Sequence, residues 1–141
     1  MPGIVGFRQY HTFLESSSFG SRPFTAPPVP IDMSQPNDVV RGTLDLLILK
    51  ALSLEPMHGW AIAQRLEQLS RDALRVGQGS LYPALQRLEE KGWVESGWRA
   101  TDENRRAKYY ELTTEGRRAL GDEAATWHRY VDMVELILRA I

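Results

Sequence analysis

The sequence predicts a mainly α-helical fold with one small β-hairpin, in the order helix, helix, helix, hairpin, helix. Three observations predict it. Apolar residues recur at helical spacing in several segments after residue 37, two short extended segments flank a polar turn at 101–106, and the last segment carries a heptad repeat. The length of 141 residues suits one domain, or a small domain with an arm, and not two full domains.

The composition excludes several classes of protein. Lys and Arg number 17 against 18 Asp and Glu, so the net charge is −1 and nucleic-acid binding would depend on locally sorted charge. Cysteine is absent, which excludes disulfides, thiol catalysis and cysteine metal sites, and fits a reducing compartment. No apolar run approaches 18 residues, so no membrane-spanning helix is expected.

The first 36 residues differ from the rest of the chain. They contain six of the eight prolines and the serine run at 16–18, without helical or strand periodicity. Such a segment cannot sustain backbone hydrogen-bond ladders, so residues 1–36 are predicted to be a disordered arm. A secretory signal is disfavoured, because no basic start precedes an apolar core. Another interpretation is that translation starts at Met33 and that the arm reflects a mis-assigned start.

Three helices are expected first, near 39–54, 59–70 and 80–91. Glu55–Pro56 ends the first helix, and His58–Gly59 opens the second. Ser80 is expected to cap the third helix, Pro83 to lie in its first turn and Gly92 to end it. The core-facing residues of these helices share helical spacing: Leu44, Leu47, Ile48, Ala51 and Leu52, then Ile62, Leu66 and Leu69, then Leu81, Leu85 and Leu88.

The hairpin strands are expected at 93–100 and 107–112, with a six-residue tip. Thr113 or Thr114 then caps a long helix that runs to the C-terminus. Three helices followed directly by a hairpin predict a winged helix-turn-helix domain at 37–113, in which the hairpin is the wing. Residues 114–141 form the C-terminal helix.

The third helix and the wing are the candidate DNA-binding elements. The outward face of the helix carries side chains suited to phosphates or base edges, followed by acidic residues at its far end. Residues 71–108 contain eight basic and six acidic residues, whereas 109–141 contain four and six. The alternative is an ordinary solvated helix face and turn. The predicted DNA-binding residues are Ser80, Tyr82, Pro83, Gln86 and Arg87 on the helix, and Arg105, Arg106 and Lys108 on the wing.

The last helix carries an apolar heptad seam that predicts a homodimer. Its members are Leu120, Ala124, Trp127, Val131, Val134 and Leu138, continued by Ile141 and flanked by Tyr130, Met133 and Ile137. A stripe this wide exceeds what one small domain covers, and exposing it in a monomer would be costly. The alternative is that the helix folds back on its own chain. Trp127 lies on the seam, where a cavity between subunits could hold a flat aromatic effector.

No catalytic, cofactor or metal site is predicted. The three histidines, His11, His58 and His128, are far apart without ligand spacing, and no nucleophile motif surrounds any serine. The remaining tryptophans, Trp60, Trp93 and Trp98, are expected to be core or interface anchors.

Four motifs in order resemble the PadR-type transcriptional regulators, a family named for repressors of phenolic acid decarboxylase genes. They are Arg41-Gly-Thr-Leu-Asp-Leu-Leu-Ile-Leu-Lys-Ala-Leu, Met57-His-Gly-Trp-Ala-Ile, Gly79-Ser-Leu-Tyr-Pro-Ala-Leu-Gln-Arg-Leu-Glu and Lys108-Tyr-Tyr-Glu-Leu-Thr. The resemblance covers about 37–141 and implies the compact branch of the family, a cytoplasmic bacterial homodimer that binds operator DNA. It implies that the last helix packs against the partner's first and last helices. The arm has no counterpart in the pattern, which favours Met33 as the start.

The expected function is therefore a sequence-specific DNA-binding regulator of transcription. It would act as a homodimeric repressor on double-stranded, palindromic operator DNA, with a small aromatic effector as a further expected partner and no membrane association. The alternative is a winged-helix protein–protein adaptor that does not bind DNA, which the small local charge excess leaves open.

Overall fold

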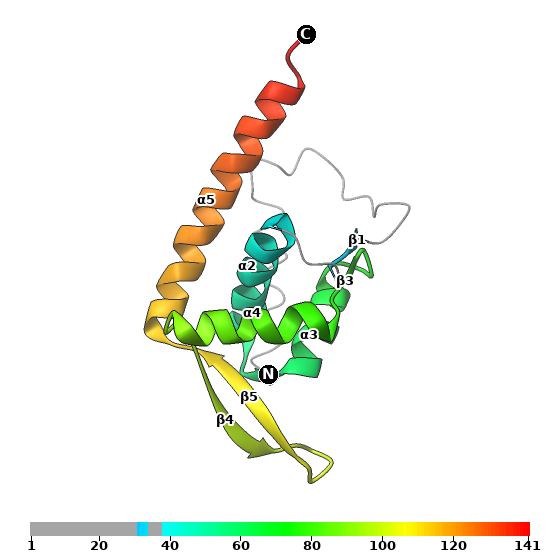
Figure 1. Cartoon of the computed structure of the whole chain (residues 1–141), viewed down its shortest axis with the longest axis vertical. Coiled ribbons are helices and arrows are strands. Elements are labelled where there is room, and N and C mark those ends of the chain that lie inside the picture. Colours follow the sequence, from blue (N-terminus) through cyan, green and yellow to red (C-terminus); the bar gives the residue numbers. More distant parts are fainter. Residues whose placement is uncertain (1–30, 34–37) are drawn as a thin grey trace.

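The computed structural model of the chain describes residues 31–33 and 38–141. It confirms the expected mainly α-helical fold with a small hairpin. Figure 1 shows the hairpin extending from one end of the molecule and the last helix projecting from the other. The helices are α2 (Asp38–Leu54), α3 (Gly59–Leu69), α4 (Gln78–Glu90) and α5 (Thr114–Leu138), and the strands are β1 (Ile31–Asp32), β2 (Met57–His58), β3 (Leu74–Arg75), β4 (Val94–Ala100) and β5 (Arg106–Leu112).

The core lies where α2, α3 and α4 meet, and the helical spacing of the sequence accounts for it. The largest fully buried side chains are Leu44, Ile48, Leu49, Leu52, Ile62, Leu81, Leu85 and Leu88. The first turns of α5 also join this core, since Ala119 is buried and Leu120 packs against the cluster. Within the described residues, no helix is both long and apolar enough to cross a membrane.

Helix α4 begins earlier than the sequence suggested, and Ser80 does not cap it. The cap is Gly77, whose extended backbone precedes the helix and whose carbonyl accepts from the Ser80 N–H at 3.2 Å. Ser80 therefore lies inside the first turn. Glycine is tolerated at this capping position because the backbone alone starts the hydrogen-bond ladder. Pro83 lies in the second turn, where it removes one N–H from that ladder.

Gly92 ends α4 as predicted. Its φ of 76° is the left-handed conformation that glycine adopts without a steric cost. The N–H groups of Gly92 and Trp93 donate to the carbonyls of Glu89 and Leu88, at 2.9 and 3.0 Å. These two bonds satisfy carbonyls that the helix end would otherwise leave open, and they turn the chain sharply into β4.

The end of α4, the start of β4 and the start of α5 form one junction. The Thr113 hydroxyl donates to the Gly92 carbonyl at 2.6 Å and accepts from the Gly116 N–H at 3.0 Å, so it caps α5 as expected. The Thr113 N–H donates to the Trp93 carbonyl at 3.1 Å. Gly116 is buried directly against that same carbonyl, which leaves no space for a side chain.

The wing belongs to a three-stranded antiparallel sheet in the order β2–β5–β4. Strands β4 and β5 pair from Val94 opposite Leu112 to Ala100 opposite Arg106, which leaves a five-residue tip instead of the expected six. The short strand β2 was not expected, and it places His58 opposite Tyr109. This pairing attaches the start of α3 to the wing.

The prediction of a disordered arm was wrong for residues 31–33, whereas residues 1–30 and 34–36 lie outside the described part of the chain. Strand β1 pairs in parallel with β3, and the Ile31 and Met33 N–H groups donate to the carbonyls of Ala73 and Arg75 at 2.7 and 2.9 Å. The Met33 side chain is buried in the core. These hydrogen bonds pair backbone N–H groups of the segment with β3, so the segment is ordered although the surrounding sequence is rich in proline.

Met33 is therefore expected to contribute to stability although it precedes the first helix. Its side chain is 7% exposed, whereas the neighbouring Ile31 is 57% exposed. Met33→Ala should lower the free energy of unfolding by about 2 kcal/mol, since truncating a buried methionine leaves a cavity. Ile31→Ala should change it by less than about 0.5 kcal/mol. Urea unfolding of both variants measures this, and equal losses would show that the Met33 side chain is not part of the core.

Candidate nucleic-acid interface

The outward face of α4 presents polar and aromatic side chains. Tyr82, Pro83 and Gln86 are exposed, as predicted, and Ser80 is half-buried in the first turn. The acidic residues follow at the end of the helix, where Glu90 is exposed and Glu89 is half-buried. The first half of α4 thus presents its polar side chains away from the acidic residues at the end of the same helix.

Arg87 differs from the expected outward orientation. Its Nη2 lies 2.8 Å from Asp45 Oδ1 and its Nε lies 3.4 Å from Asp45 Oδ2, so the guanidinium forms a two-point ion pair with α2. Both side chains are partly buried, which reduces the competition from water. The pair fixes α4 against α2, and Arg87 acts here in positioning the helix instead of presenting a charge.

One face of the wing is buried at its base and exposed towards its tip. Alternate residues of paired strands share a face, so Tyr110, Leu112 and Val94 lie on the core face. Towards the tip, that same face carries Trp98, Lys108 and Arg106, which are exposed. The Arg106 guanidinium lies 6.0 Å from the Trp98 ring, and Arg105 is exposed in the tip. The predicted wing cations therefore gather near the tip.

Lys108 also connects the wing to α4. Its Nζ lies 3.8 Å from Glu89 Oε1, too long for a hydrogen bond but within ion-pair range. Glu89 Oε1 has no hydrogen-bond partner in the described part of the chain. Burial raises the pKa of the adjacent Tyr110 phenol, and the negative charge of Glu89 raises it further. Tyr110 is thus held neutral beside the carboxylate.

An aromatic cluster lies at the start of α3, which the sequence reasoning missed. The His58 ring is stacked on Trp60 with centroids 6.3 Å apart, and it meets Tyr109 edge-on at 5.4 Å. Of the tryptophans expected to be core or interface anchors, Trp93 packs against the core, whereas Trp60 and Trp98 are exposed and do not belong to the core. The residue type alone did not distinguish these tryptophans. The useful signal is that Trp60 is the second residue of a helix that a histidine, His58, caps.

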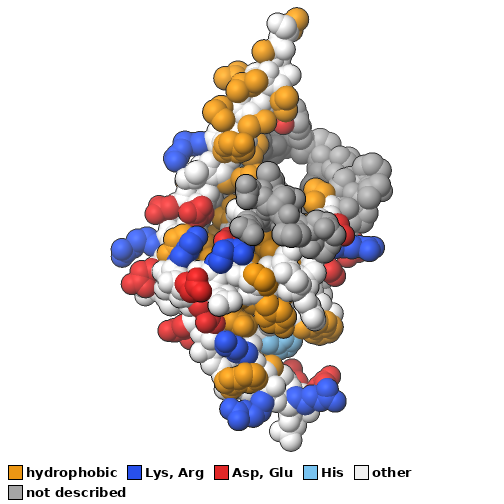
Figure 2. Space-filling view, viewed as in Figure 1, with side chains coloured by type: hydrophobic (Ala, Val, Ile, Leu, Met, Phe, Trp, Pro, Cys, Tyr) orange, Lys and Arg blue, Asp and Glu red, His pale blue; other side chains and the backbone are white. Residues whose placement is uncertain are grey.

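The far half of α5 exposes a large apolar face. Figure 2 shows hydrophobic side chains gathered over the end of this helix that is remote from the wing. The exposed apolar residues are Trp127, Tyr130, Met133, Leu136, Ile137, Leu138 and Ile141. Of the predicted seam, Leu120 is covered by its own chain and Ala124, Val131 and Val134 are half-buried. The flanking stripe of Tyr130, Met133 and Ile137 is therefore more exposed than the centre of the predicted seam.

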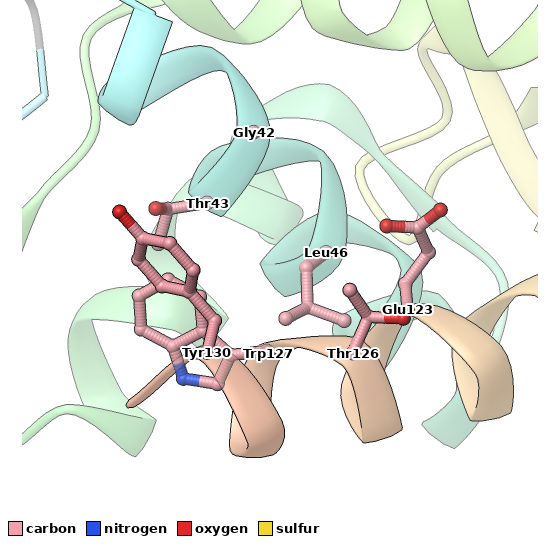
Figure 3. Close-up of a pocket in the computed structure, with 7 residues that line it drawn as sticks. All are labelled: Gly42, Thr43, Leu46, Glu123, Thr126, Trp127 and Tyr130. Carbon is pink, nitrogen blue, oxygen red and sulfur yellow. The ribbon is translucent and has the colours of Figure 1, made fainter. Parts of the chain in front are cut away.

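A hollow of about 340 Å³ lies between α2 and this face of α5. It is lined by Gly42, Thr43, Leu46, Glu123, Thr126, Trp127 and Tyr130. Figure 3 shows the two aromatic rings together at one end and the Glu123 carboxylate at the other. The ring centroids of Trp127 and Tyr130 are 6.3 Å apart, with a tilt of 32°. An apolar hollow with one carboxylate suits a flat aromatic molecule.

Three packed helices, a hairpin wing and a long last helix define a winged helix-turn-helix protein. Comparison with known families matches residues 48–122 to the transcriptional regulator PadR-like family. The chain belongs to this family, and it is accordingly a transcriptional regulator.

Individual relatives agree with this assignment. A transcriptional regulator of Mycobacterium tuberculosis is 37% identical over 83 residues, which span 59% of this chain and 74% of the relative. The crystal structure of a PadR family transcriptional regulator from Eggerthella lenta is 35% identical with a TM-score of 0.61, covering 72% of this chain and 86% of that one. A PadR-like transcription factor from Bacteroides fragilis is 31% identical with a TM-score of 0.59, covering 70% and 93%.

Proposed function

We propose that this regulator binds operator DNA as a homodimer and acts as a repressor. The observation that carries the proposal is a pair of exposed features in one domain: Tyr82, Pro83 and Gln86 on the outward face of α4, and Arg105 and Arg106 at the tip of the wing. A helix of this composition fits the major groove, and a basic hairpin fits the adjacent phosphate backbone. The DNA contacts proposed on α4 are Ser80, Tyr82, Pro83 and Gln86.

The homodimer is proposed from the apolar face of α5. Tyr130 and Ile137 are 56% and 64% exposed, and such a contiguous face is costly in water. A second copy offers the same face, so a two-fold symmetric dimer in which the two α5 faces pack together would bury both. Two recognition helices related by that axis would read a palindromic operator, and a bound dimer at a promoter would block transcription.

A second function, a winged-helix adaptor without DNA binding, is favoured by one observation. Two of the cations predicted to contact DNA, Arg87 and Lys108, lie beside carboxylates of the same chain. A gel mobility shift with duplexes selected from a random pool, at two salt concentrations, distinguishes the functions. DNA binding predicts a shift that weakens sharply with salt, whereas an adaptor gives no shift at either concentration.

The wing is expected to contact phosphates without reading sequence. Changing both Arg105 and Arg106 to alanine should weaken binding to selected and random duplexes alike. The slope of log affinity against log salt should shrink by about 2 to 4 per dimer, since each lost phosphate contact removes about one released counterion. Arg129→Ala with Arg139→Ala on α5 makes the same change in net charge and serves as the control. Equal slopes for the two double variants would contradict a wing contact.

We also propose that the hollow at Trp127 binds a flat aromatic effector. The Trp127 and Tyr130 rings supply apolar contacts, and Glu123 favours a positively charged substituent. Titration with a planar cationic dye should quench tryptophan fluorescence in the wild type. Trp127→Ala should lose this binding, and Trp98→Ala on the wing should retain it. Retained binding by the Trp127 variant would place the ligand elsewhere.

A further inference from the structure

Trp60 is the second residue of α3, and its side chain is 60% exposed. Tryptophan is highly buried on average, so an indole that remains open to solvent beside the recognition helix requires an explanation. Within the described part of the chain, its ring N–H has no hydrogen-bond acceptor. The residue therefore offers an apolar surface and a donor to which no described residue is hydrogen-bonded.

The neighbours of Trp60 restrict its ring. The His58 ring lies nearly parallel to it, with an interplanar angle of 17°. His58 is itself fixed, because its Nδ1 accepts from the Ala61 N–H at 3.2 Å and Tyr109 packs edge-on against it. The Arg99 guanidinium also lies over the Tyr109 ring, 5.4 Å from its centre. A side chain held in this way loses little conformational entropy when it binds a partner.

Trp60 also lies next to the exposed face of α4. With Gln78 and Tyr82 of α4 it lines a hollow of about 360 Å³ between α3 and α4. The two helices touch at this point, since a Cβ placed on Gly59 would lie 2.9 Å from the Tyr82 hydroxyl oxygen. The indole and the predicted base-reading residues therefore share one surface.

We propose that Trp60 contacts the sugar–phosphate backbone of DNA, its indole N–H donating to a phosphate oxygen. This inference rests on the proposed DNA-binding function. When the second helix of a helix-turn-helix lies in the major groove, the first helix crosses the backbone, and α3 is that first helix. Glu67 also lines the hollow, about two helical turns along α3 from Trp60. Its carboxylate repels a phosphate, so the phosphate is favoured at the end of the hollow where Trp60 lies.

A contact from a neutral donor has a distinctive signature. It binds the backbone without releasing a counterion, so it raises affinity for every sequence and leaves the salt dependence unchanged. The wing arginines differ, because their loss reduces the salt slope. The two kinds of backbone contact can therefore be separated in one set of titrations.

The test compares Trp60→Phe and Trp60→Ala with the wild-type protein. The probes are a duplex selected from a random pool for tight binding and a duplex of random sequence, titrated at several salt concentrations. Trp60→Phe keeps the ring and removes the donor, so affinity for both duplexes should fall by about tenfold per dimer, with the salt slope unchanged. Trp60→Ala should lose more, since the apolar contact is also removed. The thermal midpoint of Trp60→Phe should stay within a few degrees, because the residue is exposed.

Methylphosphonate duplexes supply the second measurement. Replacing the contacted phosphate with a neutral methylphosphonate should weaken wild-type binding, and Trp60→Phe should be insensitive to that same replacement. Unchanged affinity of Trp60→Phe for duplexes that the wild type binds would overturn the proposal, as would a loss confined to the selected duplex. A wild-type protein that binds no duplex would instead refute the DNA-binding function.

Discussion

Replacing Met133 with aspartate is expected to convert the protein into a monomer and to weaken operator binding by roughly 10²-fold or more. Met133 lies within the exposed apolar stripe of α5, between Tyr130 and Ile137. A carboxylate there would be buried without a partner when a second copy covers the stripe, and two-fold symmetry would insert two such charges. A monomer reads only one half-site, so the gain in effective concentration from the second half-site is lost.

Light scattering on a sizing column and an operator titration measure the two parts of this prediction. Ala125→Asp is the matched control, because this exposed residue lies about 80° around α5 from Met133, outside the Trp127–Tyr130–Met133–Ile137 stripe, and adds the same charge. A Met133 variant that remains dimeric would show that another surface forms the dimer. A monomeric variant with full operator affinity would contradict the two-half-site mechanism.

Gly116→Ala is expected to lower the free energy of unfolding by about 3 kcal/mol or more. The new methyl group would overlap the Trp93 carbonyl, and that overlap is with backbone, which cannot rotate away. Relief requires the start of α5 to move away from the Trp93 backbone, which stretches the Thr113 hydrogen bonds at the junction. For a fold of about 100 residues, such a loss corresponds to a fall in Tm of more than about 10 °C.

Gly121→Ala in the same helix is the control for this substitution. A Cβ there meets nothing within 4 Å, so the change should raise stability by roughly 0.5–1 kcal/mol, as alanine restricts the unfolded chain. Thermal unfolding of both variants checks the contrast. If Gly116→Ala were as stable as Gly121→Ala, close packing of α5 on the Trp93 backbone would be ruled out.

The long elements were predictable because each repeats a local signal. Helical spacing of leucines predicted α2, α3 and the core side of α4, and the stop at Gly92 followed from the conformational freedom of glycine. The two-residue strands were not predictable, since a pair of residues has no period. Strands β1 and β3 form only because the chain brings them together, and they order the three residues 31–33.

The candidate site was predicted in outline, and the errors in it have one physical origin. Arg87 and Asp45 are 42 positions apart, so no local pattern reveals that they pair. The one hint is the carboxylate of Asp45 within an apolar run of α2. Likewise, the exposure of Trp60 depends on where α4 packs, which only the folded chain determines. Tertiary contacts thus decided which of the predicted side chains face outward.

The junction at Thr113 has a mechanical consequence. The Thr113 hydroxyl bonds both to Gly92, just after α4, and to Gly116 at the start of α5. We therefore expect α4 and α5 of one protomer to move together as a rigid body. A molecule bound in the hollow at Trp127 would then rotate one protomer of the dimer relative to the other, without changing the position of α4 within its own protomer. Over the 25 residues of α5, even a small tilt becomes a large change in the separation of the two DNA-reading ends. An effector would thus control DNA binding by changing the spacing between the two α4 helices of the dimer. The dimer would bind its operator only when that spacing matches the helical repeat of DNA.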